Sequence, residues 1–180
     1  MIEFKEFEKI ARLNREIVIT EKIDGTNAQI TITEDGQFLT GSRTRWITPM
    51  DDNYGFAAWA LTNKDELMKL GVGSHFGEWW GSGCQRGYGL QKGEKRFSLF
   101  NTGRWDDSTK PSCCFVVPQL YVGSFSEGAI LGCLDRLRKN GSVASPGFMS
   151  PEGIIIYHTA ARQSFKVTLE KDEMPKSLVK

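Results

Sequence analysis

The sequence EKIDGTN at residues 21–27 places a lysine between an expected strand and an expected turn. Residues 16–20 read EIVIT, and such a run of β-branched side chains is typical of a strand. A neutral lysine amine can attack the α-phosphate of a nucleotide and hold the nucleotidyl group as a phosphoramidate. This chemistry requires burial or nearby cations that lower the pKa of the amine. Lys22 is therefore a candidate nucleophile.

The two residues after Ile23 extend this interpretation. Gly25 allows the backbone to approach a phosphate or a ribose closely, and Asp24 can orient the amine or a metal-bound water. The same tetrapeptide, residues 22–25, is also compatible with a hairpin turn beside a solvated lysine, because Asp-Gly is a common turn sequence. The order of the downstream segments decides between the two interpretations.

Length and composition indicate one ordinary globular domain. The chain has 180 residues, of which 39% are hydrophobic and 25% are charged, and its formal net charge is +1. This length is enough to bury a core, and no repeat or linker divides the chain, so we expect a single domain over residues 1–180. The near-neutral charge argues against nucleic-acid binding by bulk charge alone, although it allows a local basic groove.

Cysteine usage and the terminal sequence indicate the expected compartment. The four cysteines include no Cys-x-x-Cys pair and there are only two histidines, so a cysteine-based zinc site is not expected. The N-terminal residues are charged and lack an apolar signal core, and no segment approaches the length of a membrane span. We therefore expect a cytoplasmic protein with free thiols and no membrane association.

Hydrophobic periodicity predicts a strand-rich chain with few helices. Strands are predicted at residues 16–20, 28–33, 37–40, 74–80, 96–101, 153–157 and 164–169. Helical segments are predicted at residues 1–13, at residues 54–70 as one helix or two, and from Ser124 to Asn140. The last of these begins with capping-box spacing, Ser124 to Glu127, and ends before Gly141. This order predicts an α+β fold with largely antiparallel sheets.

Two downstream segments carry candidate ligand-binding side chains. Arg43 follows a predicted strand and can meet a phosphate there, although a solvated arginine at a strand end is the ordinary alternative. Glu78, in the segment FGE at residues 76–78, lies in a strongly apolar strand, where an unpaired charge is costly. Glu78 therefore needs a partner, either an internal arginine or a ligand hydroxyl such as that of a ribose.

Three further segments offer an aromatic, an acidic and a basic side chain. Phe100 ends the run FSLF at residues 97–100 and either packs in the core or stacks on a nucleobase. Glu152 precedes an apolar strand and either orients a metal-bound water or the lysine, or simply begins that strand. Lys166 lies between two apolar neighbours, where its stem can pack while its amine reaches water.

These segments together resemble the covalent nucleotidyltransferase superfamily of ATP-dependent ligases and mRNA capping enzymes. Within it, the chain is most similar to the RNA ligase group typified by phage RNA ligase 2. The matched motifs, in chain order, are the nucleotidyl-lysine motif at residues 21–27 including Asn27, Arg43, residues 76–78, residues 97–100, Glu152-Gly153 and Lys166. The resemblance covers residues 22–166, and six short motifs in the right order are much less expected by chance than any one of them.

The resemblance implies an antiparallel-sheet nucleotidyltransferase domain with flanking helices, an ATP-grasp-like ligase catalytic fold. It implies an ATP-dependent RNA ligase of the kind used in phage-like RNA repair, with ATP and Mg²⁺ or Mn²⁺ as cofactors. The expected partner is RNA with a 5′-phosphate and a 3′-hydroxyl, and no protein partner follows from the sequence. The implied catalytic residues are Lys22, Asp24 and Lys166. The implied nucleotide-binding residues are Glu21, Gly25, Asn27, Arg43, Glu78, Phe100 and Glu152, and Glu152 also serves the metal.

Two departures from the family pattern keep other functions open. Thr168 stands where relatives usually have the second lysine of a closing lysine-x-lysine motif, and only fourteen residues follow Lys166, so we expect no appended C-terminal domain. The alternatives are a capping-type nucleotidyltransferase and a nucleotide- or nucleic-acid-binding module without turnover. A further hypothesis is a basic, aromatic-interleaved surface made of Arg43, Arg45, Trp46, Arg86, Lys92, Lys95 and Arg96. RNA, DNA and hybrid substrates are all compatible with the sequence.

Overall fold

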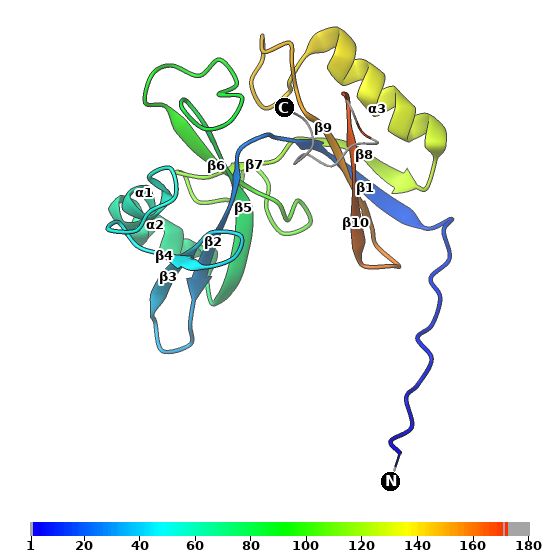
Figure 1. Ribbon diagram of the computed structural model, residues 1–180, viewed down its shortest axis with the longest axis horizontal. Helices are drawn as coiled ribbons and strands as arrows, with labels where there is room; N and C mark the ends of the chain where they lie inside the picture. Colours follow the sequence, from blue (N-terminus) through cyan, green and yellow to red (C-terminus); the bar gives the residue numbers. More distant parts are fainter. Residues whose placement is uncertain (1, 171, 173–180) are drawn as a thin grey trace.

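Two β-sheets carry the fold in this computed structural model, which describes residues 2–170 and 172 (Figure 1). The first sheet has four strands in the order β10-β9-β1-β8, and its neighbours all pair antiparallel. Its strands are β1 (Glu16–Lys22), β8 (Gln119–Ser124), β9 (Gly153–His158) and β10 (Gln163–Thr168). The strand that precedes the candidate nucleophile is therefore an inner strand of the four-stranded sheet.

The second sheet has six strands in the order β4-β3-β2-β5-β6-β7. Its strands are β2 (Thr26–Ile32), β3 (Phe38–Gly41), β4 (Trp46–Ile47), β5 (Gly73–Gly81), β6 (Lys95–Leu99) and β7 (Phe115–Val116). All neighbours are antiparallel except β6 and β7, which pair in parallel. The predicted α+β class with largely antiparallel sheets is confirmed, although the sequence did not predict the short strands β4 and β7 or the longer β8.

Each sheet is covered by helix on one face. The helices α1 (Phe56–Thr62) and α2 (Lys64–Leu67) and the 3₁₀ turn η1 (Met68–Leu70) pack on the six-stranded sheet through the fully buried Phe56, Leu67 and Leu70. Helix α3 (Glu127–Asn140) packs on the four-stranded sheet through Leu134 and Leu137. Two separate apolar cores result, one under each helical layer.

The predicted capping box of α3 is wrong by two residues. Ser124 ends strand β8 and pairs with Glu16 of β1, so it is not available as a helix cap. Ser126 is the N-cap instead, and its side chain accepts a hydrogen bond from the backbone N–H of Ala129. The predicted end is confirmed, because Gly141 follows the helix with φ 77°, a conformation that favours glycine.

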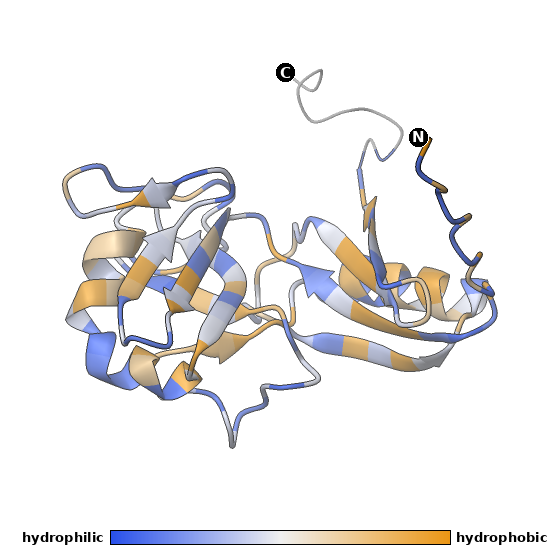
Figure 2. Ribbon diagram, turned by 90° about the horizontal axis from the view of Figure 1, so that it is seen from below, coloured by the Kyte–Doolittle hydropathy of each residue, from blue (hydrophilic) through white to orange (hydrophobic). Residues whose placement is uncertain are grey.

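A third apolar cluster joins the two sheets. It contains Ile23, Trp80, Tyr88 and Val117, with Phe148 packed against it. In the view of Figure 2 the two sheets form separate lobes, and several chain segments cross between them. Residues 23–25, which connect β1 to β2, form one of these crossings. The motif around the candidate nucleophile therefore lies where the lobes meet.

The helix predicted for residues 1–13 is not found. The described part of that segment, residues 2–13, has no helix or strand, and its apolar side chains Ile2, Phe4, Phe7 and Ile10 are exposed. Met1 lies outside the described residues. A helix of about a dozen residues is marginal in water without a packing partner, and here the segment packs on neither sheet.

Cys84, Cys113, Cys114 and Cys133 are free thiols, as predicted. Among the described residues, no helix combines the length and the apolar character needed to cross a bilayer.

Candidate active site

A cleft of about 830 Å³ lies between the two sheets and takes its lining from both. Strands β1, β9 and β10 contribute from one side and β2 and β5 from the other, together with the loop at residues 100–105. Seven of the predicted site residues line it, namely Glu21, Lys22, Asn27, Arg43, Glu78, Phe100 and Lys166. The other three, Asp24, Gly25 and Glu152, lie beside the cleft and reach it through the contacts described below.

Lys22 and Glu152 form an ion pair at the cleft. The Lys22 Nζ lies 2.7 Å from a carboxylate oxygen of Glu152, and the two side chains are 21% and 6% exposed. Strand register explains the meeting, because Lys22 of β1 pairs with Gly153 of β9, which directly follows Glu152. Since nucleophilic attack needs a neutral amine, the contact places a carboxylate within reach of the proton that Lys22 must lose.

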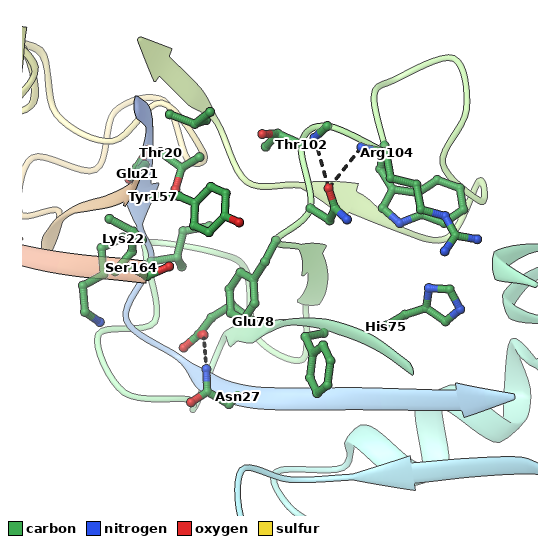
Figure 3. Close-up of a pocket in the computed structure, with 18 of the residues that line it drawn as sticks. Thr20, Glu21, Lys22, Asn27, His75, Glu78, Thr102, Arg104, Tyr157 and Ser164 are labelled. Atoms are coloured by element: carbon green, nitrogen blue, oxygen red, sulfur yellow. Dashed lines mark hydrogen bonds between the residues drawn. The ribbon is translucent and has the colours of Figure 1, made fainter. Parts of the chain in front are cut away.

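Glu78 is a buried carboxyl group held by two amides. One of its oxygens accepts a hydrogen bond from the backbone N–H of Gly25 at 3.0 Å, and the other accepts one from the side-chain amide of Asn27 at 3.2 Å (Figure 3). Register again explains this, because Asn27 of β2 pairs with Glu78 of β5. Glu78 thus has amide partners, whereas the sequence suggested an arginine or a ligand hydroxyl.

Burial shifts the ionisation of Glu78. The pKa of this carboxyl is raised to about 7, mainly by desolvation and also by the negative charges of Glu152 and Asp24, while Lys22 and the Gly25 N–H act in the opposite direction. A carboxyl group with this pKa can donate or accept a hydrogen bond near neutral pH. Glu78 is therefore suited to bind a hydroxyl group.

The raised pKa of Glu78 makes stability depend on pH. The folded protein holds the Glu78 proton up to pH 7, whereas an unfolded chain releases it near 4.5. The contribution of this proton to the free energy of unfolding is thus complete below pH 4.5 and is lost as the pH rises to 7. The contribution lost is about 3 kcal/mol. We expect urea unfolding between pH 4.5 and 7 to show this slope, and Glu78→Gln to flatten it. The raised pKa of Glu21 gives a slope of the same sign, so the informative quantity is the difference in slope between wild type and Glu78→Gln. Equal slopes for the two proteins would contradict the raised pKa of Glu78.

Asp24 is held by the loop that follows β5. The Arg86 Nε donates a hydrogen bond to the Asp24 carboxylate at 3.1 Å, and another Arg86 nitrogen donates to the backbone oxygen of Ser150. The backbone N–H of Asp24 donates to the hydroxyl of Tyr88, a side chain that is fully buried and whose pKa burial raises. Sequence reasoning missed these positioning roles of Arg86 and Tyr88, and the glycines on both sides of Tyr88 were the one available signal.

Gly25 is required by close packing against β5. A Cβ atom at this position would lie 2.4 Å from the backbone oxygen of Trp79 and 2.7 Å from the Cβ of Trp80. The sequence alone predicts that this glycine allows the close approach of a phosphate or a ribose. In the structure the close approach is to strand β5, and it brings the Gly25 N–H to Glu78.

The Glu21 carboxylate ties β1 to the loop before β9. It is 1% exposed and accepts hydrogen bonds from the Ser142 hydroxyl at 2.6 Å and from the backbone N–H groups of Val143 and Ala144 at 2.8 and 2.9 Å. Burial raises the pKa of Glu21, and these three hydrogen bonds partly oppose that shift. The contacts of this side chain are structural, and its predicted contact with a nucleotide stays a prediction.

Removing the Glu21 carboxylate should therefore destabilise the protein. Glu21→Ala leaves three donors without their acceptor, one of them the buried Ser142 hydroxyl, and we expect it to lower the free energy of unfolding by about 3 kcal/mol, measured by urea denaturation. Glu34→Ala is the control, because Glu34 is exposed in the turn between β2 and β3 and its loss should change the free energy by less than about 0.5 kcal/mol. Equal midpoints for the two variants would refute the structural role.

Arg43, Lys166 and Phe100 face the cleft from its rim. Arg43 follows β3, Lys166 lies on the edge strand β10, and both residues are exposed. The described part of the chain provides no hydrogen bond or ion pair to either side-chain cation. Lys166 is thus not buried between its apolar neighbours: its own side chain is exposed, and the neighbouring Phe165 is 53% exposed. Phe100 is 39% exposed and lies outside the apolar cores, so its core-packing alternative is wrong.

The hypothesised basic surface is not formed as a unit. Arg45 pairs with Asp51, Arg86 with Asp24 and Arg96 with Glu94, while the Lys95 amine donates to the backbone oxygen of Tyr54. Of that set, Arg43 alone lines the cleft. Sequence reasoning also missed the far end of the cleft, where His75 and Arg104 lie, as Figure 3 shows.

A metal site made of protein ligands alone is absent from residues 2–170 and 172, where no three His, Cys, Asp or Glu side chains are arranged to hold an ion. Mg²⁺ commonly binds through one or two carboxylates and completes its shell with water and substrate phosphates. Glu152, which lies beside the cleft and contacts Lys22, fits that second arrangement. The predicted role of Glu152 at a metal stays a prediction.

Known proteins resemble this chain in sequence and in fold. The sequence model of the RNA ligase family matches residues 15–168. Similar solved structures include mutants of Naegleria gruberi RNA ligase, in an apo form (19% identity, TM-score 0.62), with ATP and Mn (19%, 0.60) and with AMP and Mn (19%, 0.59). Each match covers 89% of this chain and 52 or 53% of the other, so this chain spans about half their length. At this identity they show a shared fold; no curated protein matches by sequence.

Proposed function

The chain belongs to the RNA ligase family, and from this premise we propose that it is an ATP-dependent RNA ligase that acts through a lysyl-AMP intermediate. In this proposal the Lys22 amine attacks the α-phosphate of ATP and pyrophosphate leaves. AMP then passes to the 5′-phosphate of an RNA strand, and a 3′-hydroxyl displaces AMP to form the phosphodiester bond. The observation that carries the proposal is the Lys22 amine in a cleft between two sheets, paired with Glu152 at 2.7 Å.

The cleft offers a complementary group for each part of a nucleotide. Glu78, with its pKa of about 7, is suited to a ribose hydroxyl, and Phe100 presents an exposed ring to adenine. Arg43 and Lys166 supply cations for phosphates. We propose four further roles: Asp24 orients the reacting groups, Gly25 brings its N–H to Glu78, Asn27 serves the junction of AMP and RNA, and Glu21 holds the nucleotidyl-lysine strand in place.

ATP and a divalent cation are proposed as cofactors. The Naegleria gruberi structures with ATP or AMP and Mn support this choice. When bound, the cation neutralises phosphate charge and aligns the in-line displacement, and Glu152 is the residue that would hold it together with nucleotide phosphates. Glu152 is also the group placed to accept the proton that Lys22 loses. We propose in addition that the two sheets work as one adenylyltransferase domain, because the cleft takes its lining from both.

The proposal is tested with ATP labelled at the α-phosphate, in the presence of Mg²⁺. We expect AMP label that survives denaturation of the protein, and ligated product when RNA with a 5′-phosphate and a 3′-hydroxyl is added. Preference for GTP in the same assay would favour a capping-type enzyme. Nucleotide binding without covalent label would favour a binding module. A panel of nicked and single-stranded RNA, DNA and hybrid substrates then identifies the acceptor.

A further inference from the structure

Phe76 is an exposed aromatic side chain with polar neighbours on β2 and β5. It lies on β5 between Ser74 and Glu78, which share its face, and it is 54% exposed. Directly opposite it in the sheet is Gln29 of β2. Phe76 packs in none of the three apolar clusters of the described chain. Folding therefore does not explain a phenylalanine at this position.

A second hollow of about 170 Å³ adjoins the nucleotide cleft at Phe76. The two share Asn27, Arg43, Phe76 and Phe100, so the hollow continues the cleft along the β2–β5 face. Gln29 and Ser42 line the hollow but not the cleft. Glu78 lines the cleft but not the hollow. The hollow therefore lies on the side of Asn27 that is away from the Glu78 carboxyl.

The hollow combines the groups that bind one unpaired nucleotide. An exposed aromatic face is a platform for a base, and Arg43, whose cation has no partner within the described residues, is complementary to a phosphate. The side-chain amide nitrogen of Gln29 donates to the hydroxyls of Thr31 at 2.8 Å and Ser74 at 3.4 Å, which holds this side chain beside Phe76. Its amide oxygen is left as an acceptor for the edge of a base.

We propose that Phe76 is the stacking platform for an unpaired RNA base next to the ligation junction, with the phosphate of that nucleotide at Arg43. The site adjoins the one proposed for ATP: Glu78 lines only the cleft, whereas Phe100 lines both the cleft and the hollow. This inference rests on the proposed function, because RNA is the substrate assumed. It explains why an apolar ring is kept exposed beside Arg43, whose cation has no partner in the part of the chain that the structure describes.

The test compares Phe76→Ala with Phe76→Tyr and with Phe165→Ala. Phe165 is a matched control, because it is 53% exposed on β10 and lines neither the cleft nor the hollow. Two measurements are needed: covalent labelling by ATP, and filter binding of single-stranded RNA by protein without ATP. We expect Phe76→Ala to label normally but to bind RNA about ten- to a hundredfold more weakly. Phe76→Tyr and Phe165→Ala should bind as the wild type does.

The RNA probes distinguish which strand occupies the hollow. One carries a 5′-phosphate and a blocked 3′ end, and the other carries a 5′-hydroxyl and a free 3′-hydroxyl; a Phe76→Ala defect with either supports the platform. RNA binding by Phe76→Ala equal to that of Phe165→Ala would overturn the inference, and so would a loss of ATP labelling, which would assign Phe76 to the ATP site. Absence of labelling in the wild type would instead refute the proposed function, and the binding comparison would still decide the role of Phe76.

Discussion

Lys22→Ala should abolish covalent AMP labelling, because the proposed phosphoramidate forms on the Lys22 amine. Lys22→Arg is expected to give the same loss. The guanidinium keeps the positive charge beside Glu152 but does not lose its proton at accessible pH. The pair of variants therefore separates the nucleophile from the ion pair. The measurement is retention of α-labelled AMP on denatured protein after incubation with ATP and Mg²⁺.

Two controls show that a loss of label comes from chemistry. Lys92→Ala changes an exposed lysine in the loop after β5 and should label normally. Sealing of RNA that already carries AMP at its 5′ end bypasses the lysine, so Lys22→Arg should retain measurable activity on that substrate. Label on Lys22→Ala equal to that on the wild type would remove Lys22 from the mechanism.

Lys166→Ala should slow AMP labelling by at least about a hundredfold. The exposed cation of Lys166 lines the same cleft as Lys22 and has no ion pair within the described residues, so its charge is available to the phosphates of ATP. Removing one preorganised contact to the charge of a transition state typically lowers a rate by a factor of a hundred to a thousand. The rate of label uptake at saturating ATP measures this effect.

The stability of the Lys166 variant should not change, which distinguishes catalysis from folding. Lys166 is exposed on an edge strand, so Lys166→Ala is expected to unfold within about 0.5 kcal/mol of the wild type. Lys139→Ala, which changes an exposed lysine near the end of α3, is the charge-matched control and should keep the full rate. Near-normal labelling by Lys166→Ala would exclude the phosphate contact.

Local patterns in the sequence predicted most of the secondary structure. Alternation at residues 28–33 and the Asp35-Gly36 turn predicted the β2–β3 hairpin, and the apolar spacing before Gly141 predicted α3. These signals are local, because side-chain period and turn chemistry are properties of a few neighbouring residues. The prediction of a helix at the N-terminus was wrong because it used local spacing alone. Its spacing was helical, but only packing against another element would have stabilised it.

The order of short motifs was also enough to predict the family and seven of the residues that line the cleft. Lys22, Glu78 and Lys166 all line it, as their motifs indicated. What those residues contact was not predictable. The sequence offered an arginine as a partner for Glu78 and a phosphate or ribose as the neighbour of Gly25, whereas the structure pairs Glu78 with the Gly25 N–H itself.

The chain by itself therefore determined which residue types are available and in which order they occur along the strands. The tertiary structure alone decided which of them meet: Glu152 reaches Lys22 across 130 residues of sequence, and Gln29 lies opposite Phe76 through the β2–β5 register. The physical reason is that register between strands distant in sequence depends on how both apolar cores close together, and shifting it by one residue would turn every one of these side chains to the opposite face.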